Sequence, residues 1–483
     1  MTVKNKKRIS FWLSVILIVA TVMGYGIMPM GALEANAAGT GVSAKCLLAD
    51  ASTVQFSAKL SAAPKTDDGM LYLYQLKTFE YAIPAGAAPV ASCAASAKPV
   101  MSFALGGREA GGRLYAKYAL AAKQGGAVVM LGSPQYISNP EILATHTHRE
   151  ARPAKTTVGA ELTNLTINGS GEGNMPTGFC KRTIQVLCKG GNAITNPKAV
   201  APDTHPVTPQ HFMLNAATDA GIEGLVRDMT NYASNGAGQD FIIGNEVNER
   251  MWNYMAWTSW EDYMREYAQA FRVCYTAIKS CNADAKVYIS LDQNWNRNRP
   301  ASHPEYYSYI DGADFLKMFA GIINDGGNID WDLAIHPYTV PLTYAKFWDM
   351  TGAPDGAYCA KQVKNNAMMS FQNMSVVTTY MTKGEMLNRS GKMRDIIINE
   401  FGVSTAQGED VQAAALCAAY YAFEKNPGIT QFMYLSNSGY GVDSTMYPKT
   451  QAVFDALGTA NESAQMSWAA GYMGVSNLSQ VVR

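Results

Sequence analysis

Phe241-Ile242-Ile243-Gly244-Asn245-Glu246 is the stretch of sequence that decides the fold. It is a run of apolar residues that ends in Asn-Glu, and a second such run, Ile396-Ile397-Ile398-Asn399-Glu400, comes later in the chain. Short continuous apolar runs are typical of strands that are buried on both faces of a parallel sheet. Each run therefore predicts a buried strand with one carboxylate at its C-terminal end.

The rhythm of the chain around these two runs predicts an α/β fold. From Gly238 onward apolar runs alternate with helical patterns. The expected strands are 240–245, 286–292, 331–336, 394–400 and 430–435, and the expected helices are 259–281, 313–323, 375–387 and 409–425. Such alternation indicates a parallel sheet covered by helices, either an open doubly wound sheet or part of a barrel. The sequence has neither G-x-G-x-x-G nor a Walker lysine motif, which disfavours the nucleotide-binding sheets.

The start of this sheet is harder to locate. A helix is expected over 209–234, and strands are expected over 162–167 and 183–187. A full barrel needs one more strand before Asp240. We therefore expect an eight-stranded β/α (TIM) barrel over 150–460, incomplete in its first strands.

Residues 40–140 have a different pattern. Short alternating segments, such as 52–58 and 113–120, are separated by Gly, Pro and Asp turns. Strands at this spacing predict a β-rich accessory domain that resembles a sandwich.

Residues 1–37 have the organisation of a signal peptide. A basic stretch, Lys4 to Arg8, precedes an apolar run over 9–28, and Ala35-Asn36-Ala37 supplies a cleavage site. We expect a secreted protein, extracellular or at the cell surface, and an uncleaved membrane anchor is the alternative. No later segment is apolar over about 18 residues, so no stable membrane insertion is expected after cleavage. The N-terminal sequence of the exported protein tests this prediction.

The net charge and the cysteine content disfavour several classes of protein and of binding site. Removing four basic residues and one acidic residue with the signal leaves 35 basic and 38 acidic residues, a net charge of −3. A nucleic-acid binder would need a basic patch, so no nucleic-acid partner is expected, and a neutral sugar polymer fits better than a charged substrate. The eight cysteines include no C-x-x-C pair, so no metal and no cofactor are expected. Nothing in the sequence indicates an oligomeric state.

The two strand-end carboxylates carry the functional prediction. The C-terminal ends of barrel strands meet at one face, where the chemistry of such folds takes place. Glu246 and Glu400 are therefore expected to face one cavity, which is the minimum equipment for cleaving a glycosidic bond. Asn-Glu recurs as Asn248-Glu249, but no apolar run precedes it, and we expect a solvated loop there.

These motifs resemble the retaining glycoside hydrolases of the large clan built on β/α barrels. In that clan the acid/base Glu follows an Asn on the fourth strand, as in Gly244-Asn245-Glu246, and the nucleophile Glu ends the seventh, as in Asn399-Glu400-Phe401-Gly402. His336-Pro337-Tyr338 looks like the His-x-Tyr of the cellulase-type members. The stretch from Gly244 to about Tyr434 is more similar still to an uncharacterised group of secreted bacterial proteins in this superfamily.

The resemblance implies a role for each residue of the motifs. Glu246 is expected to be the acid/base and Glu400 the nucleophile. Asn245 would bind the sugar 2-hydroxyl, Tyr338 would hydrogen-bond Glu400, and His336 would line the neighbouring subsite.

Aromatic residues near the strand ends are the remaining substrate-binding candidates. Trp295 follows the fifth strand, and Tyr434 stands near the place where cellulase-type members carry a Trp on the eighth strand. Such rings can stack on sugars, and ordinary packing is the alternative. The clan's Arg after the second strand and His after the third have no located counterpart.

The expected function is that of a secreted glycoside hydrolase. It would cleave O-glycosidic bonds of a poly- or oligosaccharide with retention of configuration, by double displacement. The alternative is a non-catalytic carbohydrate-binding or cell-surface protein on a degenerate barrel. Release of reducing sugar from a panel of glycans separates the two.

Overall fold

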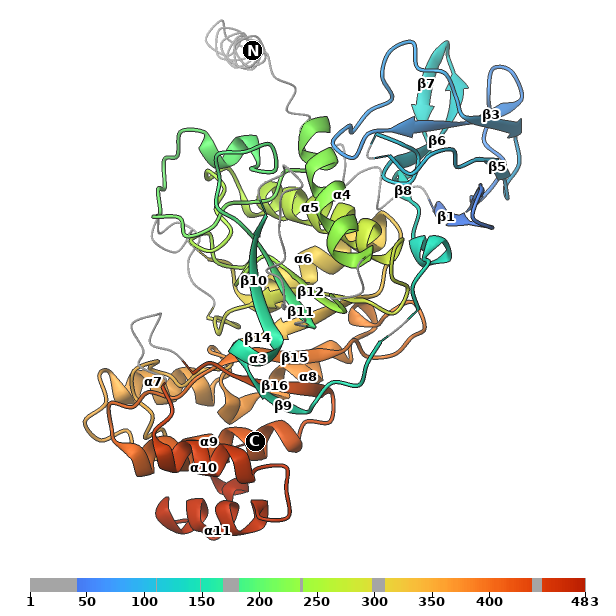
Figure 1. Ribbon diagram of the computed structural model, residues 1–483. Coiled ribbons are helices and arrows are strands. Elements are labelled where there is room, and N and C mark those ends of the chain that lie inside the picture. Colours follow the sequence, from blue (N-terminus) through green and yellow to red (C-terminus); the bar gives the residue numbers. More distant parts are fainter. Residues whose placement is uncertain are drawn as a thin grey trace, which may run out of the picture.

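The computed structural model describes residues 41–109, 111–147, 149–167, 182–234, 238–297, 309–436 and 445–482. The signal peptide predicted over residues 1–37 lies outside the described residues. An antiparallel part comes first in the chain, and a parallel sheet with its helices follows beside it (Figure 1).

The N-terminal part consists of two antiparallel sheets, with strand orders β1-β2-β5 and β4-β3-β6-β7, and β8 pairs with β6. Every second residue of β2 is buried, because alternate side chains of a strand point to opposite faces. The strands are β1 (Ser43–Leu48), β2 (Thr53–Lys59), β3 (Met70–Leu76), β4 (Ala91–Ala94), β5 (Val100–Ala104), β6 (Lys117–Gln124), β7 (Ala127–Met130) and β8 (Gln135–Tyr136).

The second part contains a parallel sheet of eight strands in the order β10-β11-β12-β13-β14-β15-β16-β9. Its first strand in the chain, β9, pairs with its last, β16, so the sheet curls round on itself. The strands are β9 (Lys155–Thr157), β10 (Leu162–Ile167), β11 (Thr183–Cys188), β12 (Asp240–Ile243), β13 (Lys286–Leu291), β14 (Trp331–Ile335), β15 (Ile396–Phe401) and β16 (Ile429–Tyr434).

The strand missing from the sequence prediction is β9. It has only three residues and no apolar run, which is why the pattern did not show it. A single helical turn, α3 (Val158–Glu161), leads from β9 to β10, and among the described residues these two strands form no ladder with each other. The predicted α/β fold with a curled parallel sheet and N-terminal antiparallel sheets is confirmed, whereas closure into a complete eight-stranded barrel stays a prediction.

One residue from each of six strands fills the inside of the curled sheet. These side chains are fully or almost fully buried, as in the packed interior layers of a barrel. They are Leu162, Ile242, Tyr288, Ala334, Ile397 and Met433.

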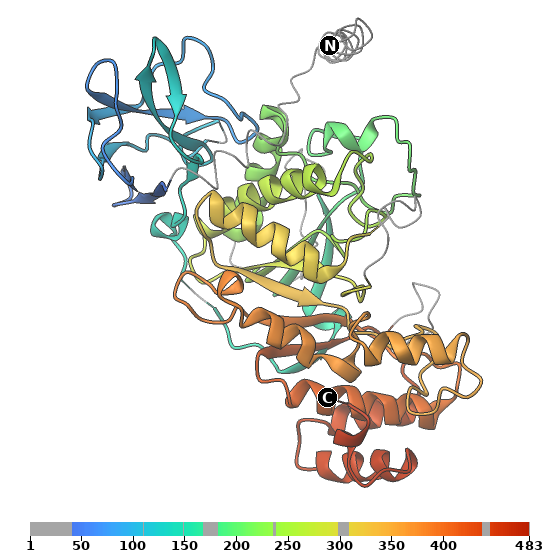
Figure 2. The same ribbon diagram turned by 180° about the vertical axis from the view of Figure 1, so that it is seen from behind.

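Helices cover the outside of the sheet. Helices α4, α5 and α6 lie on the flank nearest the antiparallel part, and α9, α10 and α11 lie at the opposite end of the molecule (Figures 1 and 2). The α-helices are α4 (Asp219–Ser234), α5 (Trp260–Lys279), α6 (Gly312–Asp325), α7 (Gly356–Lys364), α8 (Ser375–Met381), α9 (Glu409–Glu424), α10 (Pro448–Ala456) and α11 (Glu462–Tyr472). Short 3-10 turns occur at Pro140–Leu143, Pro197–Val200, Phe371–Asn373, Gly384–Met386 and Leu478–Gln480.

Two helices are shorter than the sequence pattern predicted. The helix expected over 209–234 begins only at Asp219, after a turn in which Asn215 accepts from Ala217 N at 3.0 Å. The helix expected over 375–387 ends at Met381 and continues as a separate 3-10 turn. In both segments polar side chains satisfy the backbone in a turn, and this competes with helix formation.

The end of the sheet away from the strand C-termini is held by buried charges. Arg152, in the segment that leads into β9, contacts Asp395 Oδ2 at 2.5 Å and Tyr288 OH at 2.9 Å. Lys286 Nζ also lies 2.5 Å from Asp395 Oδ2. Burial alone would raise the pKa of Asp395, but Arg152 and Lys286 outweigh it and hold the pKa at about 2. This network ties the incoming chain to β13 and β15.

The antiparallel part packs on the flank of the helices rather than on the strand ends. Tyr136 N donates to Gly326 O at 2.9 Å, and Lys77 Nζ lies 2.6 Å from Asp219 Oδ2. The seven cysteines within the described ranges are free thiols. In the part of the chain that the structure describes, no helix has the length and apolar character needed to cross a bilayer.

Candidate active site

A pocket of about 320 Å³ lies where strands β12 to β16 end. Its volume is in the range of small-molecule sites, roughly 300–1,000 Å³. Its walls come from the loops after β12, β13, β14 and β16 and from β15 itself, so the antiparallel part contributes none of them. The lining residues are Asn245, Glu246, Glu249, Met251, Trp252, Asp292, Gln293, Asn294, Tyr338, Leu342, Glu400 and Leu435.

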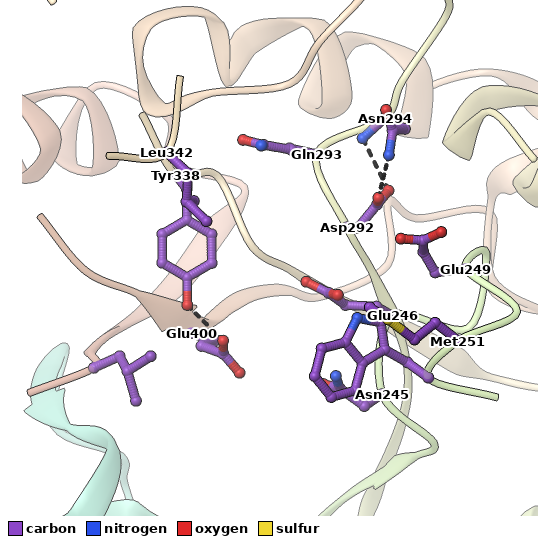
Figure 3. A pocket seen from close by; sticks show the side chains of 12 residues that line it. Asn245, Glu246, Glu249, Met251, Asp292, Gln293, Asn294, Tyr338, Leu342 and Glu400 are labelled. Carbon is purple, nitrogen blue, oxygen red and sulfur yellow. Dashed lines mark hydrogen bonds between the residues drawn. The ribbon is translucent and has the colours of Figure 1, made fainter. Parts of the chain in front are cut away.

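Both predicted catalytic carboxylates line this pocket. Figure 3 shows Glu246 and Glu400 on opposite sides of it, with their carboxyl groups turned toward the space between them. Glu246 follows β12, and Glu400 lies on β15, next to a register irregularity between Ile398 and Phe401. Such irregularities re-aim side chains at barrel rims. The structure therefore brings together the two residues that the sequence singled out.

A tight turn after β12 directs Glu246 into the pocket. Gly244 has φ +88°, and a Cβ there would lie 2.5 Å from Val247 Cγ1. Glu246 itself has φ +40°, in the left-handed region that non-glycine residues rarely adopt. Val247, fully buried, then turns back into the core. The turn closes through a hydrogen bond from Glu249 N to Glu246 O at 2.7 Å, which puts residues 246 and 249 on the same side.

A buried histidine contacts the carboxyl group of Glu246 and holds it in place. His336, which is 0% exposed, places Nδ1 2.8 Å from Glu246 Oε1, and its Nε2 lies 3.2 Å from Ser290 Oγ. Burial alone would lower the pKa of His336, but the charges of Glu400 and Glu246 outweigh it and raise the pKa to about 9. The raised pKa favours the ring with a proton on both nitrogens, which donates to Glu246 and to Ser290.

Asn245 is held in place by a residue that the sequence analysis missed. Gln185, on β11, donates from Nε2 to Asn245 Oδ1 at 2.6 Å and to Gly244 O at 3.3 Å. Gln185 is 1% exposed, and its position inside the sheet gave no signal in the sequence beyond a polar residue in an apolar strand. The amide nitrogen of Asn245 is thereby left as the group that faces the pocket.

Tyr338 supports Glu400. Its hydroxyl donates to Glu400 Oε1 at 2.5 Å, as the resemblance implied. Burial raises the pKa of Glu400, and the charge of Glu246 adds to this, whereas His336 and the hydrogen bond from Tyr338 oppose it. The tyrosine and the histidine are thus the groups that favour the ionised form of Glu400.

Two predicted substrate-binding residues lie elsewhere. Trp295 is 2% exposed and packs edge-on against Tyr380 at 5.4 Å. Tyr434 is 0% exposed, and its hydroxyl accepts from Val403 N at 3.3 Å. Neither lines the pocket, and neither ring has a free face for a sugar. Both rings are packed in the interior of the protein.

The pocket also holds acidic residues that the sequence analysis did not assign to it. Glu249 was expected to lie in a solvated loop, but it lines the pocket. Asp292 directly follows β13, so the strand-end rule applied to Glu246 and Glu400 would have found it. Trp252 also lines the pocket, and its ring stacks on His211 at 6.0 Å.

These carboxylates do not form a metal centre by their arrangement. Within the described ranges, no group of three or more His, Cys, Asp and Glu side chains has a geometry that would hold a metal ion.

The comparisons with known proteins give a family and a set of distant structures. Residues 180–481 match the model of a family described as a family of unknown function (DUF5722). None of the curated proteins matches the sequence.

Among solved structures, the FMN-binding β-glucuronidase from Facaelibacterium prausnitzii L2-6 is 11% identical, with a TM-score of 0.26 over 89% of this chain and 62% of that one. A glucosidase from Croceicoccus marinus is 12% identical, with a TM-score of 0.35 over 65% of this chain and 61% of that one. An endo-β-1,3-glucanase (GH128, subgroup II) from Sorangium cellulosum is 14% identical, with a TM-score of 0.32 over 64% of this chain and 100% of that one. These neighbours are glycoside hydrolases, at similarities too low to assign any residue.

Proposed function

The chain belongs to the family of unknown function DUF5722, and we propose that this member is a glycoside hydrolase that acts by a retaining, two-carboxylate mechanism. One observation carries the proposal. Glu246 and Glu400 face each other across one pocket, and each is supported by its own partner, His336 for Glu246 and Tyr338 for Glu400. Retaining glycosidases need two carboxyl groups that flank the scissile bond and perform different tasks.

The first step forms a covalent intermediate. Glu400, as the carboxylate, attacks the anomeric carbon, and the bond from that carbon to the glycosidic oxygen breaks. The Glu246–His336 pair holds one proton, and Glu246 passes it to the leaving oxygen while His336 becomes neutral, so the departing sugar leaves as an alcohol. The hydrogen bond from Tyr338 favours the charged form of Glu400 that this attack requires.

The second step releases the sugar. Water attacks the anomeric carbon, passes a proton to Glu246, and the ester bond to Glu400 breaks. Both carboxyl groups return to their starting states, and two inversions leave the anomeric configuration of the substrate unchanged. His336 acts as a positioning residue throughout, because its Nδ1 fixes Glu246 Oε1 at 2.8 Å and leaves the other oxygen for the substrate.

Substrate binding at the reacting ring would use Asn245 and Trp252. Asn245 is fixed by Gln185 and faces the pocket, where an amide can hydrogen-bond a sugar hydroxyl. Trp252 takes over the stacking role that was predicted for Trp295 and Tyr434, because its half-buried ring lines the pocket. We also propose that the protein acts outside the cytoplasm, on the strength of the signal peptide predicted over residues 1–37.

The test is a screen of glycans for release of reducing sugar, followed by NMR of the first-formed product. Retention of the anomeric configuration is expected, and inversion would refute the mechanism. Glu246→Gln and Glu400→Gln are each expected to lower turnover by at least about 10²–10⁴-fold, while Glu385→Gln, an exposed glutamate away from the pocket, keeps the wild-type rate. Binding of glycans without any hydrolysis would favour the carbohydrate-binding alternative.

Acid and nucleophile are distinguished by a second experiment. An aryl glycoside with a good leaving group needs little help from an acid, so Glu246→Ala is expected to form the covalent intermediate and to accumulate it. Azide, a small anion that fits the space left by the carboxyl group, should then restore turnover in Glu246→Ala and yield a glycosyl azide. No rescue is expected in Glu400→Gln, because the first bond to the sugar never forms.

A further inference from the structure

A buried serine contacts both members of the pair formed by Glu246 and His336. Ser290 lies on β13, between β12, which Glu246 follows, and β14, which His336 follows, and it is 0% exposed. Its Oγ accepts a hydrogen bond from Glu246 N at 3.3 Å and lies 3.2 Å from His336 Nε2. The mechanism above gives this hydroxyl no task.

The backbone of β13 fixes the place of the hydroxyl. On one side, Val247 N donates to Ser290 O at 2.8 Å and anchors the turn that carries Glu246. On the other side, His336 N donates to Leu291 O at 3.2 Å. One short strand segment thus holds the acid, the hydroxyl and the imidazole ring in a fixed arrangement.

The hydroxyl oxygen can accept from both of its neighbours. A serine oxygen has two lone pairs and one hydrogen. The backbone N–H of Glu246 can only donate, so it takes one lone pair, and the second lone pair is available to a proton on His336 Nε2. Among the described residues, the contacts of the two ring nitrogens are those to Glu246 and to Ser290, so Nε2 has Ser290 as its partner.

The charges around the ring favour a proton on Nε2. Burial alone would lower the pKa of His336, but Glu400 on β15, Glu246 after β12 and Asp292 after β13 outweigh it and raise the pKa to about 9. Tyr338, two residues further along the chain, donates its hydroxyl to Glu400 and not to the ring. The ring is therefore a donor at both nitrogens, and Ser290 is the acceptor for one of them.

From these contacts we infer that Ser290 is a positioning residue of the proposed hydrolase: its oxygen accepts from the backbone of Glu246 and from Nε2 of His336, and this stabilises the proton that the pair delivers to the leaving group. Which ring nitrogen keeps a proton is set by the hydrogen bond that the ring makes there. Without an acceptor, a buried Nε2–H would lose its partner, and the doubly protonated ring would become less stable. The inference rests on the proposed function and adds a residue to its acid.

The imidazole nitrogen resonances test the inference without any substrate. The chain has six histidines, and the signals of His336 are assigned by their loss in His336→Asn. In the wild-type chain at neutral pH both ring nitrogens should carry a proton. In Ser290→Ala the midpoint of the titration should fall by about 1–2 pH units, which is the worth of a hydrogen bond to a charged group. Ser290→Thr, which keeps a hydroxyl, should retain most of the wild-type midpoint.

The alkaline limb of kcat/KM is the matching kinetic readout, because it reports loss of the essential proton from the free enzyme. The limb should move to lower pH in Ser290→Ala by the same amount as the NMR midpoint. Ser290→Cys should behave in the same way, since a thiol fills the space but is a weak acceptor. Ser280→Ala, at a buried serine at the end of α5, is the matched control and should keep the wild-type profile.

The leaving group of the substrate separates a role in acid catalysis from a general loss of activity. An alkyl glycoside depends on the acid, and its cleavage at pH 8 should fall by about tenfold or more in Ser290→Ala. A dinitrophenyl glycoside of the same sugar needs little help from an acid, so its rate should stay within about twofold. Thermal midpoints of all Ser290 variants check that the fold is intact.

The outcomes separate this inference from the proposed function. A wild-type ring with a bare Nε2, or an unchanged midpoint in Ser290→Ala, overturns the inference while hydrolysis stands. An equal loss at every pH and for both leaving groups also overturns it, because a serine that only supports the turn gives this result. A shifted midpoint in a chain that cleaves no glycan supports the hydrogen bond to Nε2 and overturns the hydrolase, together with the task of Ser290 in it.

Discussion

Replacement of Tyr338 by Phe is the sharpest probe of the proposed nucleophile. The substitution removes one hydroxyl, whose oxygen lies 2.5 Å from Glu400 Oε1 and donates a hydrogen bond to it. The ring is 8% exposed and packs near Phe401 at 6.3 Å and His336 at 6.4 Å, and all of these ring contacts remain in Tyr338→Phe. The variant therefore tests one hydrogen bond rather than the packing of the pocket.

The magnitude follows from the charge of the acceptor. A hydrogen bond to an ionised group is worth about 1.5–3 kcal/mol, which corresponds to about 10- to 150-fold in rate when the bond supports the reacting form. Burial and Glu246 already raise the pKa of Glu400, and Tyr338 opposes them. Without the hydroxyl, the pKa of Glu400 rises further, so less of the carboxylate is present at neutral pH.

The assay is kcat/KM as a function of pH for the best glycoside from the screen. In Tyr338→Phe the acid limb of the profile should move to higher pH, and the deficit should shrink as the pH rises, because Glu400 ionises again. Tyr472→Phe, at an exposed tyrosine, is the matched control and should keep the wild-type profile. A wild-type profile in Tyr338→Phe, or a uniform loss at every pH together with a lower thermal midpoint, would refute the assigned role.

Two further predictions concern stability. Burial raises the pKa of Asp332 from an ordinary value of 3.8 to about 6, so the folded protein holds this proton more tightly than the unfolded chain does. The free energy of unfolding that this proton contributes is fully present below pH 3.8 and is lost as the pH rises through 6. Asp332→Asn should therefore raise the free energy of unfolding at pH 7.5 by up to about 3 kcal/mol and change little at pH 4, as measured in urea; no gain at pH 7.5 would contradict this. Arg152→Met should lower the free energy of unfolding by about 1.5–3 kcal/mol, because Asp395 and Asp240 each lose one cation while Lys286 and Arg149 remain. Urea denaturation at pH 7.5 measures this loss, and a change below about 1 kcal/mol would mean that Lys286 alone neutralises Asp395.

The order of the elements and the two carboxylates were open to prediction from sequence for a simple reason. An apolar run flanked by helical patterns can be stable only as a buried parallel strand, and the C-terminal ends of such strands meet at one edge. Glu246 and Glu400 therefore lie at the same edge of the sheet, and the curling of the sheet brings them to face each other although β13 and β14 lie between their strands. The supporting partners His336 and Tyr338, at the end of β14, came instead from the resemblance of His336-Pro337-Tyr338 to the His-x-Tyr of the cellulase-type members.

Other features depend on how the chain turns after each strand, and no local pattern encodes this. The strand β9 has three residues and is stabilised as a strand only by its ladder to β16. Trp295 follows its strand as Glu246 does, yet it points into the core, where its ring packs against Tyr380.

Glu249 is a residue that the sequence placed outside the pocket and the structure places in its wall. Its sequence context is that of a solvated loop, but the left-handed turn at Glu246 and the clamp from Asn248 to Asp292 bring it back over the pocket. The sequence by itself thus determined which carboxylates end the buried strands, because burial of apolar runs is a local requirement. Only the tertiary structure decided that a second pair, Glu249 and Asp292, stands beside them, because long-range hydrogen bonds between separate strand-end loops set the direction of those side chains.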